Sequence, residues 1–235
     1  MKCLLIIPAY NEAENIEKVV DNIVQNYPEY DYIIVNDGSK DNTEKICLKN
    51  GYYVLNLPIN LGIGGAVQTG YCYARDNDYD VAVQIDGDGQ HDVGYLEEMI
   101  KLIENGQADV VIGSRFVEKE GFQSSKIRRI GIKFLSGLAK ILTGVRVRDI
   151  TSGYRAVNRM FINIFAEDYP SDYPEPEAMV IAAVYGGKIR EYPVVMRERE
   201  NGESSITLKK SVYYMIKVTL AMMIRRLSFG VRRDK

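Results

Sequence analysis

A recurring pattern constrains the fold most: an apolar, strand-like run, then a polar turn, then apolar residues at helical spacing. The first run, residues 3–7, precedes apolar positions spaced as in a helix between residues 16 and 24. Similar runs occupy residues 31–35, 52–57 and 81–85. Strands that alternate with helices form a largely parallel sheet with helices on both faces. We therefore expect an α/β fold with a largely parallel central sheet flanked by helices.

A polar or glycine-rich turn follows each of these four runs. In open α/β sheets, ligands bind beyond the carboxyl ends of the strands, where such turns gather on one rim. We expect a ligand site formed jointly by the four turns, which are Pro8 to Glu12, Asp37-Gly38-Ser39, Asn60 to Gly65, and Asp86 to Gln90.

The turn after residues 81–85 carries two carboxylates, Asp86 and Asp88, with glycines at 87 and 89. Residues two apart in a turning backbone can face one ion, and glycine permits the tight backbone that this requires. Mg²⁺ and Mn²⁺ prefer carboxylate oxygens and often share their coordination shell with substrate phosphates. The turn therefore indicates a divalent metal bound together with a diphosphate. An acidic surface turn after a core strand is the alternative.

The glycine-rich turn before a helix expected from about Ala66 to Arg75 is not a dinucleotide fingerprint. Val67 occupies the position of the third glycine of that fingerprint, and the turn lies in the third strand-helix unit rather than the first. Gly64 and its neighbours could still offer backbone amides to a phosphate at the helix N-terminus, or form only a tight turn.

Length and cysteine usage narrow the class of protein. The 235 residues, 46% of them hydrophobic, suffice for one domain or one domain with an appendage. Three cysteines without metal-binding or redox spacing favour a reduced, cytoplasmic setting. The first residues begin a strand pattern at once, so we expect no signal peptide.

The formal net charge of −2 conceals a strong asymmetry. Residues 1–114 contain 7 Lys and Arg against 19 Asp and Glu, whereas residues 115–235 contain 23 against 13. The acidic and basic halves suggest contacts with cations and anions respectively, although solvated helix faces produce part of such an asymmetry.

Two basic segments in the second half have amphipathic character. Between residues 123 and 143, apolar residues recur at helical spacing among five Lys and Arg, and residues 212–224 form an apolar stretch with basic residues on both sides. A helix of residues 212–224 is about 20 Å long, too short for a bilayer core of roughly 30 Å. We expect these segments to lie on anionic lipid, with packing on the sheet, on a membrane protein or on a second subunit as alternatives.

Six motifs in order resemble those of family 2 glycosyltransferases, and most closely the branch of polyprenyl-phosphate sugar synthases such as dolichol-phosphate mannose synthase. The resemblance covers about residues 3 to 206. Its motifs are Pro8-Ala9-Tyr10-Asn11-Glu12, Asn36-Asp37-Gly38-Ser39 with Asp41-Asn42-Thr43, Asn60-x-Gly62, Asp86-x-Asp88-x-Gln90-His91, Gly113-Ser114-Arg115, and Asp149-x-Thr151-Ser152-Gly153-Tyr154-Arg155.

The resemblance implies a glycosyltransferase type A fold. Its catalytic domain would span residues 1–206, with a nucleotide-sugar and metal half (1–114) and an acceptor half (115–206), followed by a basic amphipathic helix (207–235). It also implies an inverting transfer in which Mg²⁺ or Mn²⁺, held by Asp86, Asp88 and Gln90, assists departure of the nucleoside diphosphate. The residues it implies in nucleotide-sugar binding, together with Gly64 from the glycine-rich turn, are Pro8, Ala9, Tyr10, Glu12, Asp37, Gly38, Gly64 and Asp86. It makes His91, the only histidine, a structural neighbour rather than a base.

By motif order, the resemblance implies Arg115, Arg129 and Arg199 on an acceptor phosphate. Arginine suits this role because its guanidinium binds two phosphate oxygens at once. Arg199 lies in a segment similar to the family's Arg-x-x-Gly-x-Ser-Lys, in which Ser205 replaces the usual lysine. The implied catalytic set is Asp88, Arg115 and Glu177.

The chemistry depends on the acceptor. A lipid phosphate is largely an anionic nucleophile at pH 7 and needs no base. A hydroxyl of a lipid-linked saccharide needs a carboxylate, for which Glu175 and Glu177, just before a helix expected over residues 178–186, are candidates. First-turn stabilisation of that helix is the alternative role for Glu177. A nucleotide-sugar-binding module without turnover is the alternative from another class of protein.

Overall fold

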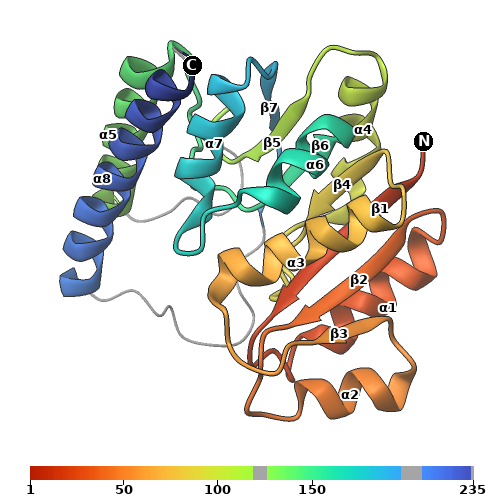
Figure 1. Cartoon of the computed structure of the whole chain (residues 1–235). Helices are drawn as coiled ribbons and strands as arrows, with labels where there is room; N and C mark the ends of the chain where they lie inside the picture. Colours follow the sequence, from red (N-terminus) through yellow and green to blue (C-terminus); the bar gives the residue numbers. More distant parts are fainter. Residues whose placement is uncertain (119–125, 197–207, 234–235) are drawn as a thin grey trace.

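A seven-stranded sheet forms the centre of the computed structural model, which describes residues 1–118, 126–196 and 208–233 (Figure 1). The strand order is β3-β2-β1-β4-β6-β5-β7, and all neighbours are parallel except β6, which is antiparallel to β4 and β5. The strands are β1 (Cys3–Ala9), β2 (Asp31–Asn36), β3 (Val54–Asn56), β4 (Val81–Gln84), β5 (Val110–Ser114), β6 (Arg155–Asn158) and β7 (Ile189–Pro193).

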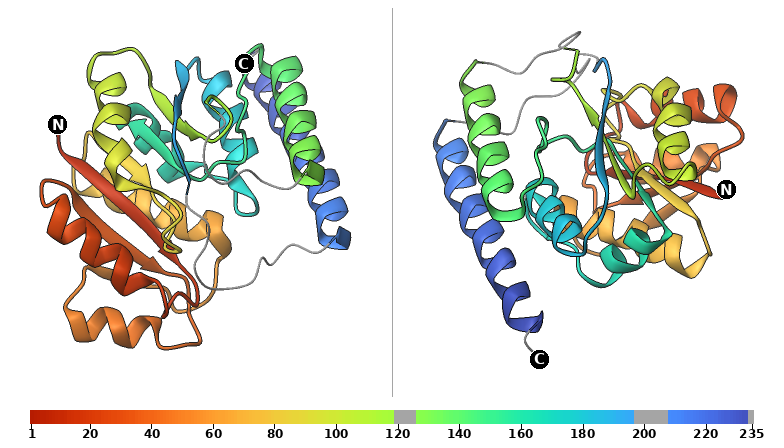
Figure 2. Two further views of the ribbon diagram at one scale, coloured as in Figure 1. Left: turned by 180° about the vertical axis from the view of Figure 1, so that it is seen from behind. Right: turned by 90° about the horizontal axis from the view of Figure 1, so that it is seen from above.

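Helices cover both faces of the sheet, as the alternating pattern predicts. Figures 1 and 2 show α1, α2 and α4 on one face and α3, α6 and α7 on the other, with α5 and α8 side by side against α7. The helices are α1 (Ile16–Asn26), α2 (Thr43–Asn50), α3 (Gly62–Asp76), η1 (Val93–Tyr95), α4 (Leu96–Glu104), α5 (Lys126–Thr143), α6 (Arg159–Glu167), α7 (Pro174–Val184) and α8 (Leu208–Arg233).

The central strand β1 shows why the sheet forms. All seven of its residues are buried, because helices pack on both of its faces. Leu4 and Ile6 point into the core under α3, whereas Leu5 and Ile7 point into the core under α1 and α4. The alternation of side chains along a strand thus divides one apolar run between two cores.

Several elements differ from the sequence expectation in their bounds. Helix α3 begins at Gly62 rather than near Ala66, and α7 begins at Pro174 rather than Ala178. Proline is favoured in the first turn of a helix because it lacks the amide that would be unpaired there. Glu175 and Glu177 therefore lie inside the first turn of α7, not before the helix.

Helix α8 spans most of the segment in which a basic amphipathic helix is expected, residues 207–235. Its 26 residues are about 39 Å long at 1.5 Å per residue, so the 20 Å length of the apolar stretch 212–224 is not the length of the helix. Charged side chains such as Lys217, Arg225 and Arg226 interrupt its apolar sequence. Among the residues that the structure describes, no helix combines the length and apolarity needed to span a membrane.

Candidate active site

The turns after β1 and β2 are joined by direct hydrogen bonds at the rim of the sheet. The Asn11 amide donates to Ser39 Oγ over 2.9 Å, and the Lys40 amide donates to Asn11 Oδ1 over 2.8 Å. Beside them, the Glu12 amide donates to Thr43 Oγ1 over 2.9 Å. The two motifs therefore form one surface, on which Tyr10 is 43% exposed and available to a ligand.

Asp37 is fixed at the end of β2. Its side chain is buried, and Oδ1 accepts a hydrogen bond of 2.7 Å from the Leu61 amide, while Asn60 donates to the Asp37 carbonyl over 3.0 Å. Gly38 has a φ of +65°, and a Cβ there would lie 2.9 Å from the Asn60 nitrogen. The turns after β2 and β3 are thus packed so closely that only glycine fits between them.

The acidic turn after β4 has a defined geometry. The Gln90 amide donates to Asp88 Oδ1 over 3.0 Å, and Gly89 adopts a φ of +77°. Gly87 lies under the first motif, since a Cβ there would be 3.1 Å from the Pro8 carbonyl oxygen. Asp86, Asp88 and Gln90 therefore belong to one short loop beside the turns after β1 and β2, which the sequence predicts to bind a nucleotide and which we call the nucleotide rim.

His91 orients this loop. Its Nδ1 accepts a hydrogen bond of 3.0 Å from the Asp86 amide, so Nε2 carries the proton in the neutral ring and faces Asp86 Oδ2 at 3.6 Å. The ring is stacked on Tyr154, with centroids 4.8 Å apart. Both nitrogens are directed at the Asp86 residue, which fits a structural neighbour of the carboxylate rather than a base.

The donor atoms of the loop fit a hard divalent cation that shares its shell with a substrate. Within the described ranges, no group of three or more His, Cys, Asp or Glu side chains could hold a metal by itself. Two carboxylates and an amide oxygen form an incomplete oxygen-rich set, the kind that Mg²⁺ and Mn²⁺ complete with phosphate and water. Gln84 Nε2 donates a hydrogen bond of 3.4 Å to Asp86 Oδ1 and so helps to position that carboxylate.

Gly64 is packed against protein. Its amide donates to the Ser171 carbonyl over 3.1 Å, and a Cβ at this position would lie 2.0 Å from the Pro170 carbonyl oxygen. The amide is therefore already engaged by the loop between α6 and α7. The glycine thus permits a close contact between two chain segments. This agrees with the structural interpretation of the glycine-rich turn rather than with phosphate binding by the Gly64 amide.

Arg115, the residue that follows β5, is anchored by Asp149. Its Nε and Nη2 donate to the two carboxylate oxygens over 2.7 Å each, and its amide donates to Oδ2 over 3.1 Å. Both side chains are buried. The bidentate pair fixes the orientation of the guanidinium plane of Arg115.

Sequence reasoning missed Arg128, which the structure brings to Arg115. Partial burial, and next the positive charge of Arg115, lower the pKa of the Arg128 guanidinium, so the two cations lie within electrostatic reach of each other. Solvent still reaches the Arg128 side chain. The helical spacing of α5 could have indicated it, because Arg128 lies one turn before Ile132 and two turns before Leu135, which are both buried, on the same side of the helix.

Arg129, the residue expected by motif order, is half-buried one position further along α5. Arg199, the third arginine expected on an acceptor phosphate, and the neighbouring Ser205 lie outside the described residues.

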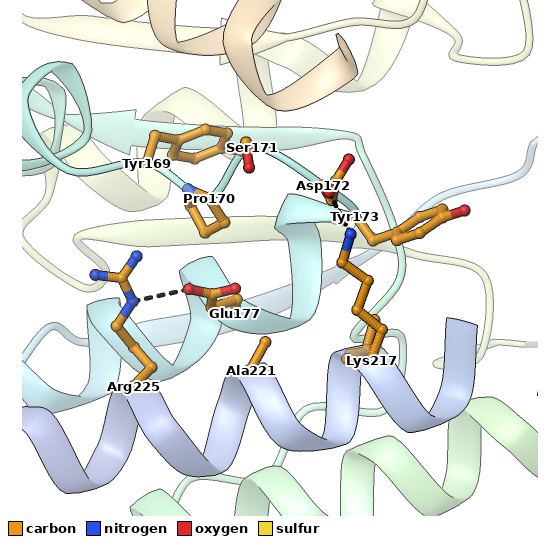
Figure 3. Close-up of a pocket in the computed structure, with 10 residues that line it drawn as sticks. Tyr169, Pro170, Ser171, Asp172, Tyr173, Glu177, Lys217, Ala221 and Arg225 are labelled. Carbon is orange, nitrogen blue, oxygen red and sulfur yellow. Dashed lines mark hydrogen bonds and ion pairs between the residues drawn. The ribbon is translucent and has the colours of Figure 1, made fainter. Parts of the chain in front are cut away.

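The two candidate bases on α7 have different surroundings. Glu177 Oε1 accepts a hydrogen bond of 2.8 Å from Arg225 of α8, beside a cavity of about 240 Å³ (Figure 3). Burial raises the pKa of the Glu175 carboxyl, Arg155 partly opposes this, and the charge of Asp86 raises it further. Glu177 therefore faces the C-terminal helix, whereas Glu175 is within electrostatic reach of the acidic loop.

A buried arginine connects the two halves of the site. Arg155 is 2% exposed and donates to the carbonyls of Ile150, Ser152 and Glu175 over 2.9, 2.8 and 2.7 Å. These bonds hold the first turn of α7 against the loop before β6. Gly153 in that loop faces the acidic turn, since a Cβ there would lie 3.1 Å from Asp86 Oδ1.

The sequence model of glycosyl transferase family 2 matches residues 4–165, which include the nucleotide rim, the acidic loop and Arg155. The chain belongs to glycosyl transferase family 2. The glycosyltransferase prediction is thus confirmed at the level of the family, and the central sheet is that of its type A fold.

Family 2 relatives include lipid-phosphate sugar transferases. The chain is 34% identical over 210 residues to UDP-N-acetylglucosamine–dolichyl-phosphate N-acetylglucosaminyltransferase of Methanococcus voltae, covering 81% of this chain and 83% of that protein. It is 30% identical to polyprenol monophosphomannose synthase of Mycolicibacterium smegmatis, covering 88% and 81%. The resemblance to the polyprenyl-phosphate branch is therefore confirmed.

A solved structure shows the same fold at low identity. Glucosyl-3-phosphoglycerate synthase of Mycobacterium tuberculosis, in complex with Mn²⁺, UDP-glucose and phosphoglyceric acid, superimposes with a TM-score of 0.75 at 18% identity. The match covers 96% of this chain and 79% of that protein.

Proposed function

We propose that this family 2 enzyme transfers a sugar, with inversion, from a UDP- or GDP-sugar to a polyprenyl phosphate. It would do so as a peripheral protein at the inner, cytoplasmic face of the membrane. The observation that carries the proposal is the pair of arginines, Arg115 and Arg128, on the acceptor side of a rim that already holds the acidic loop. The lipid-phosphate acceptors in the names of its relatives support the same reaction.

On the donor side, the exposed Tyr10 and the fixed Asp37 would bind the nucleoside, with Pro8, Ala9, Glu12 and Gly38 shaping the rim. Asp86, Asp88 and Gln90 would hold Mg²⁺ or Mn²⁺, which when bound neutralises the charge of the departing diphosphate. His91 and Gln84 contact the Asp86 backbone and carboxylate and would hold that carboxylate in place when the ion binds.

On the acceptor side, the nucleophile is a phosphate oxygen that is already anionic at pH 7, so no base is required. Arg115, held flat by Asp149, and Arg128 would bind the other phosphate oxygens and orient the reacting one. Arg129 and Arg199 are proposed as further contacts from motif order. A phosphate bound by both side chains would offset the repulsion between the two cations.

Glu175 favours a second candidate reaction, transfer to a hydroxyl of a lipid-linked saccharide. Its raised pKa and its nearness to Asp86 suit a carboxylate that takes a proton in the transition state. Glu177, the other candidate, is paired with Arg225 on the far side of α7 and would serve less well.

The decisive experiment measures nucleoside diphosphate release by the purified protein. UDP- and GDP-sugars are supplied with Mg²⁺ or Mn²⁺, with and without undecaprenyl or dolichyl phosphate. Release that requires the lipid phosphate, with the sugar recovered on it, supports the proposal and identifies the donor. Slow release independent of the lipid points to the saccharide acceptor. Donor binding with no release under any condition would instead indicate a binding module.

A further inference from the structure

Helix α8 is apolar on two opposite sides. Val218, Met222 and Phe229 are buried against the protein. The side turned away from the protein carries large apolar residues spaced three or four apart, each between 42% and 69% exposed. They are Tyr213, Ile216, Leu220, Met223, Ile224 and Leu227.

An ordinary surface helix of the same molecule looks different. Helix α1 buries Ile16, Val20 and Ile23 and exposes mostly polar residues, with Val24 as an exception at 48%. One buried face is enough to pack a helix on a sheet. Among the residues that the structure describes, nothing covers the outward face of α8, which therefore fits an external partner.

Helix α5 extends this surface. Its outward residues Ile130, Phe134 and Ile141 are 69%, 54% and 83% exposed, and α5 lies beside α8 (Figure 2). Met215 of α8 fits against Gly131, where a Cβ would lie 3.2 Å from its sulfur. We call the exposed apolar residues of α5 and α8 the two-helix face.

Polar contacts prevent the two-helix face from turning inward. Arg225 binds Glu177 and Asp168 over 2.8 Å, and Lys217 binds Asp172, so both cations reach toward α7 and its preceding loop (Figure 3). Arg226 Nε donates to the Leu142 carbonyl of α5 over 2.8 Å. These contacts fix the rotation of α8 and join the two helices.

The charge of the two helices selects the partner. Together α5 and α8 contain twelve Lys and Arg and no Asp or Glu. Lys217 and Arg225 pair with acidic residues of the protein, whereas Lys133, Lys140 and Arg226 are exposed. A second copy docked on this face would bring these like charges together. An anionic leaflet matches both the charge and the apolar residues.

We infer that the two-helix face docks the protein on an anionic lipid leaflet, with Ile130, Phe134 and the outward residues of α8 inserted among the headgroups. The docking inference rests on the proposed function in one respect: docking would bring the phosphate of a membrane-embedded acceptor to Arg128 at the start of α5. Helices α1 and α2 lie on the opposite side of the molecule from α5 and α8 (Figure 1).

The test uses the full chain and co-sedimentation with phosphatidylcholine vesicles with and without phosphatidylglycerol. Sedimentation with anionic vesicles at low salt and release at high salt are expected. The double variant Leu220→Asp/Leu227→Asp should reduce binding about tenfold or more, and Ile141→Asp should act independently on α5. Val24→Asp, an equally exposed apolar position on α1, is the matched control and should bind as wild type does.

A second readout separates this inference from the proposed reaction. The two-helix variants should turn over a water-soluble short-chain prenyl phosphate at the wild-type rate and lose turnover only of long-chain acceptor in vesicles. If the wild-type protein turns over neither acceptor, the proposed function is overturned. Vesicle binding by the wild-type protein and the variants then tests the membrane inference by itself. Wild-type-like binding by the Asp variants, or a wild-type dimer that Leu220→Asp converts to monomer in light scattering, would overturn the membrane inference.

Discussion

Arg155, the first residue of β6, donates from Nη1 to the backbone carbonyl of Glu175 over 2.7 Å, which joins β6 to the first turn of α7. The same guanidinium satisfies two further carbonyls in the loop before β6. One buried side chain thus sets the distance between the donor half of the site and the helix that carries both candidate carboxylates.

Replacing Arg155 with Lys should destabilise the protein. An ammonium group cannot reach three carbonyls in the plane of a guanidinium, so buried acceptors lose their donors, at a cost of about 2–4 kcal/mol in the free energy of unfolding. Urea denaturation measures this change. The control is Arg159→Lys, at a half-exposed surface pair with Asp78, where a change of about 0.5 kcal/mol or less is expected. Equal effects of the two substitutions would contradict the role assigned to Arg155.

Gly153→Ala should impair metal-dependent turnover. The new Cβ would lie 3.0 Å from Gln84 Nε2 and 3.1 Å from Asp86 Oδ1, so the carboxylate must shift. We expect the Mn²⁺ concentration for half-maximal nucleoside diphosphate release to rise about tenfold or more. Gly137→Ala is the matched control, because nothing lies within 4 Å of its Cβ on α5 and alanine favours helix there. An unchanged metal dependence in Gly153→Ala would show that Asp86 tolerates displacement.

Asp88→Asn should abolish turnover while the protein stays folded. The amide keeps an oxygen for the Gln90 hydrogen bond but removes the negative charge that a divalent cation requires. A loss of about a hundredfold or more in product release is expected across all metal concentrations. Asp76→Asn, at the exposed end of α3, should retain the wild-type rate. Full activity in Asp88→Asn would eliminate the proposed metal site.

Arg128→Gln should weaken use of the phosphate acceptor and leave the donor unaffected. The substitution removes one of the two cations expected to bind the acceptor phosphate, so its KM should rise about tenfold or more. The KM for the sugar nucleotide should not change. Lys133→Gln removes an exposed charge from the same helix and serves as the control with a water-soluble acceptor. Equal rises in both KM values for Arg128→Gln would indicate a general structural defect.

Glu175→Gln should change how stability depends on pH. Burial raises the folded-state pKa of Glu175 above its unfolded value, so the folded protein binds the proton more tightly. Its favourable contribution is complete below the ordinary glutamate range and is lost as pH rises through the folded pKa. Glutamine does not titrate, so the variant does not lose this contribution. Its free energy of unfolding should therefore rise relative to that of the wild type as the pH increases from the ordinary glutamate range toward neutral. Urea denaturation at several pH values tests this, and parallel curves for both proteins would refute it.

The sequence alone determined the donor half of this protein. Parallel strands end at one rim, so the motifs around Tyr10, Asp37 and Asp86 had to converge wherever the helices packed. The continuous apolar run at residues 3–7 likewise suits a strand that is buried on both faces, as β1 is. These conclusions depend on local periodicity and on a rule of topology, both of which are visible in a single chain.

Tertiary structure decided the acceptor half. Glu177 is paired with Arg225, 48 residues away, and Gly64 is held by Ser171, so no local pattern shows that these groups are engaged. Arg128 comes within electrostatic reach of Arg115 because the rotation of α5 is set by what Ile132 and Leu135 pack against. Likewise, residues 212–224 read as amphipathic in sequence, but only the contacts of α8 show which side remains exposed. Contacts between distant segments, with their packing and charge, fix these details.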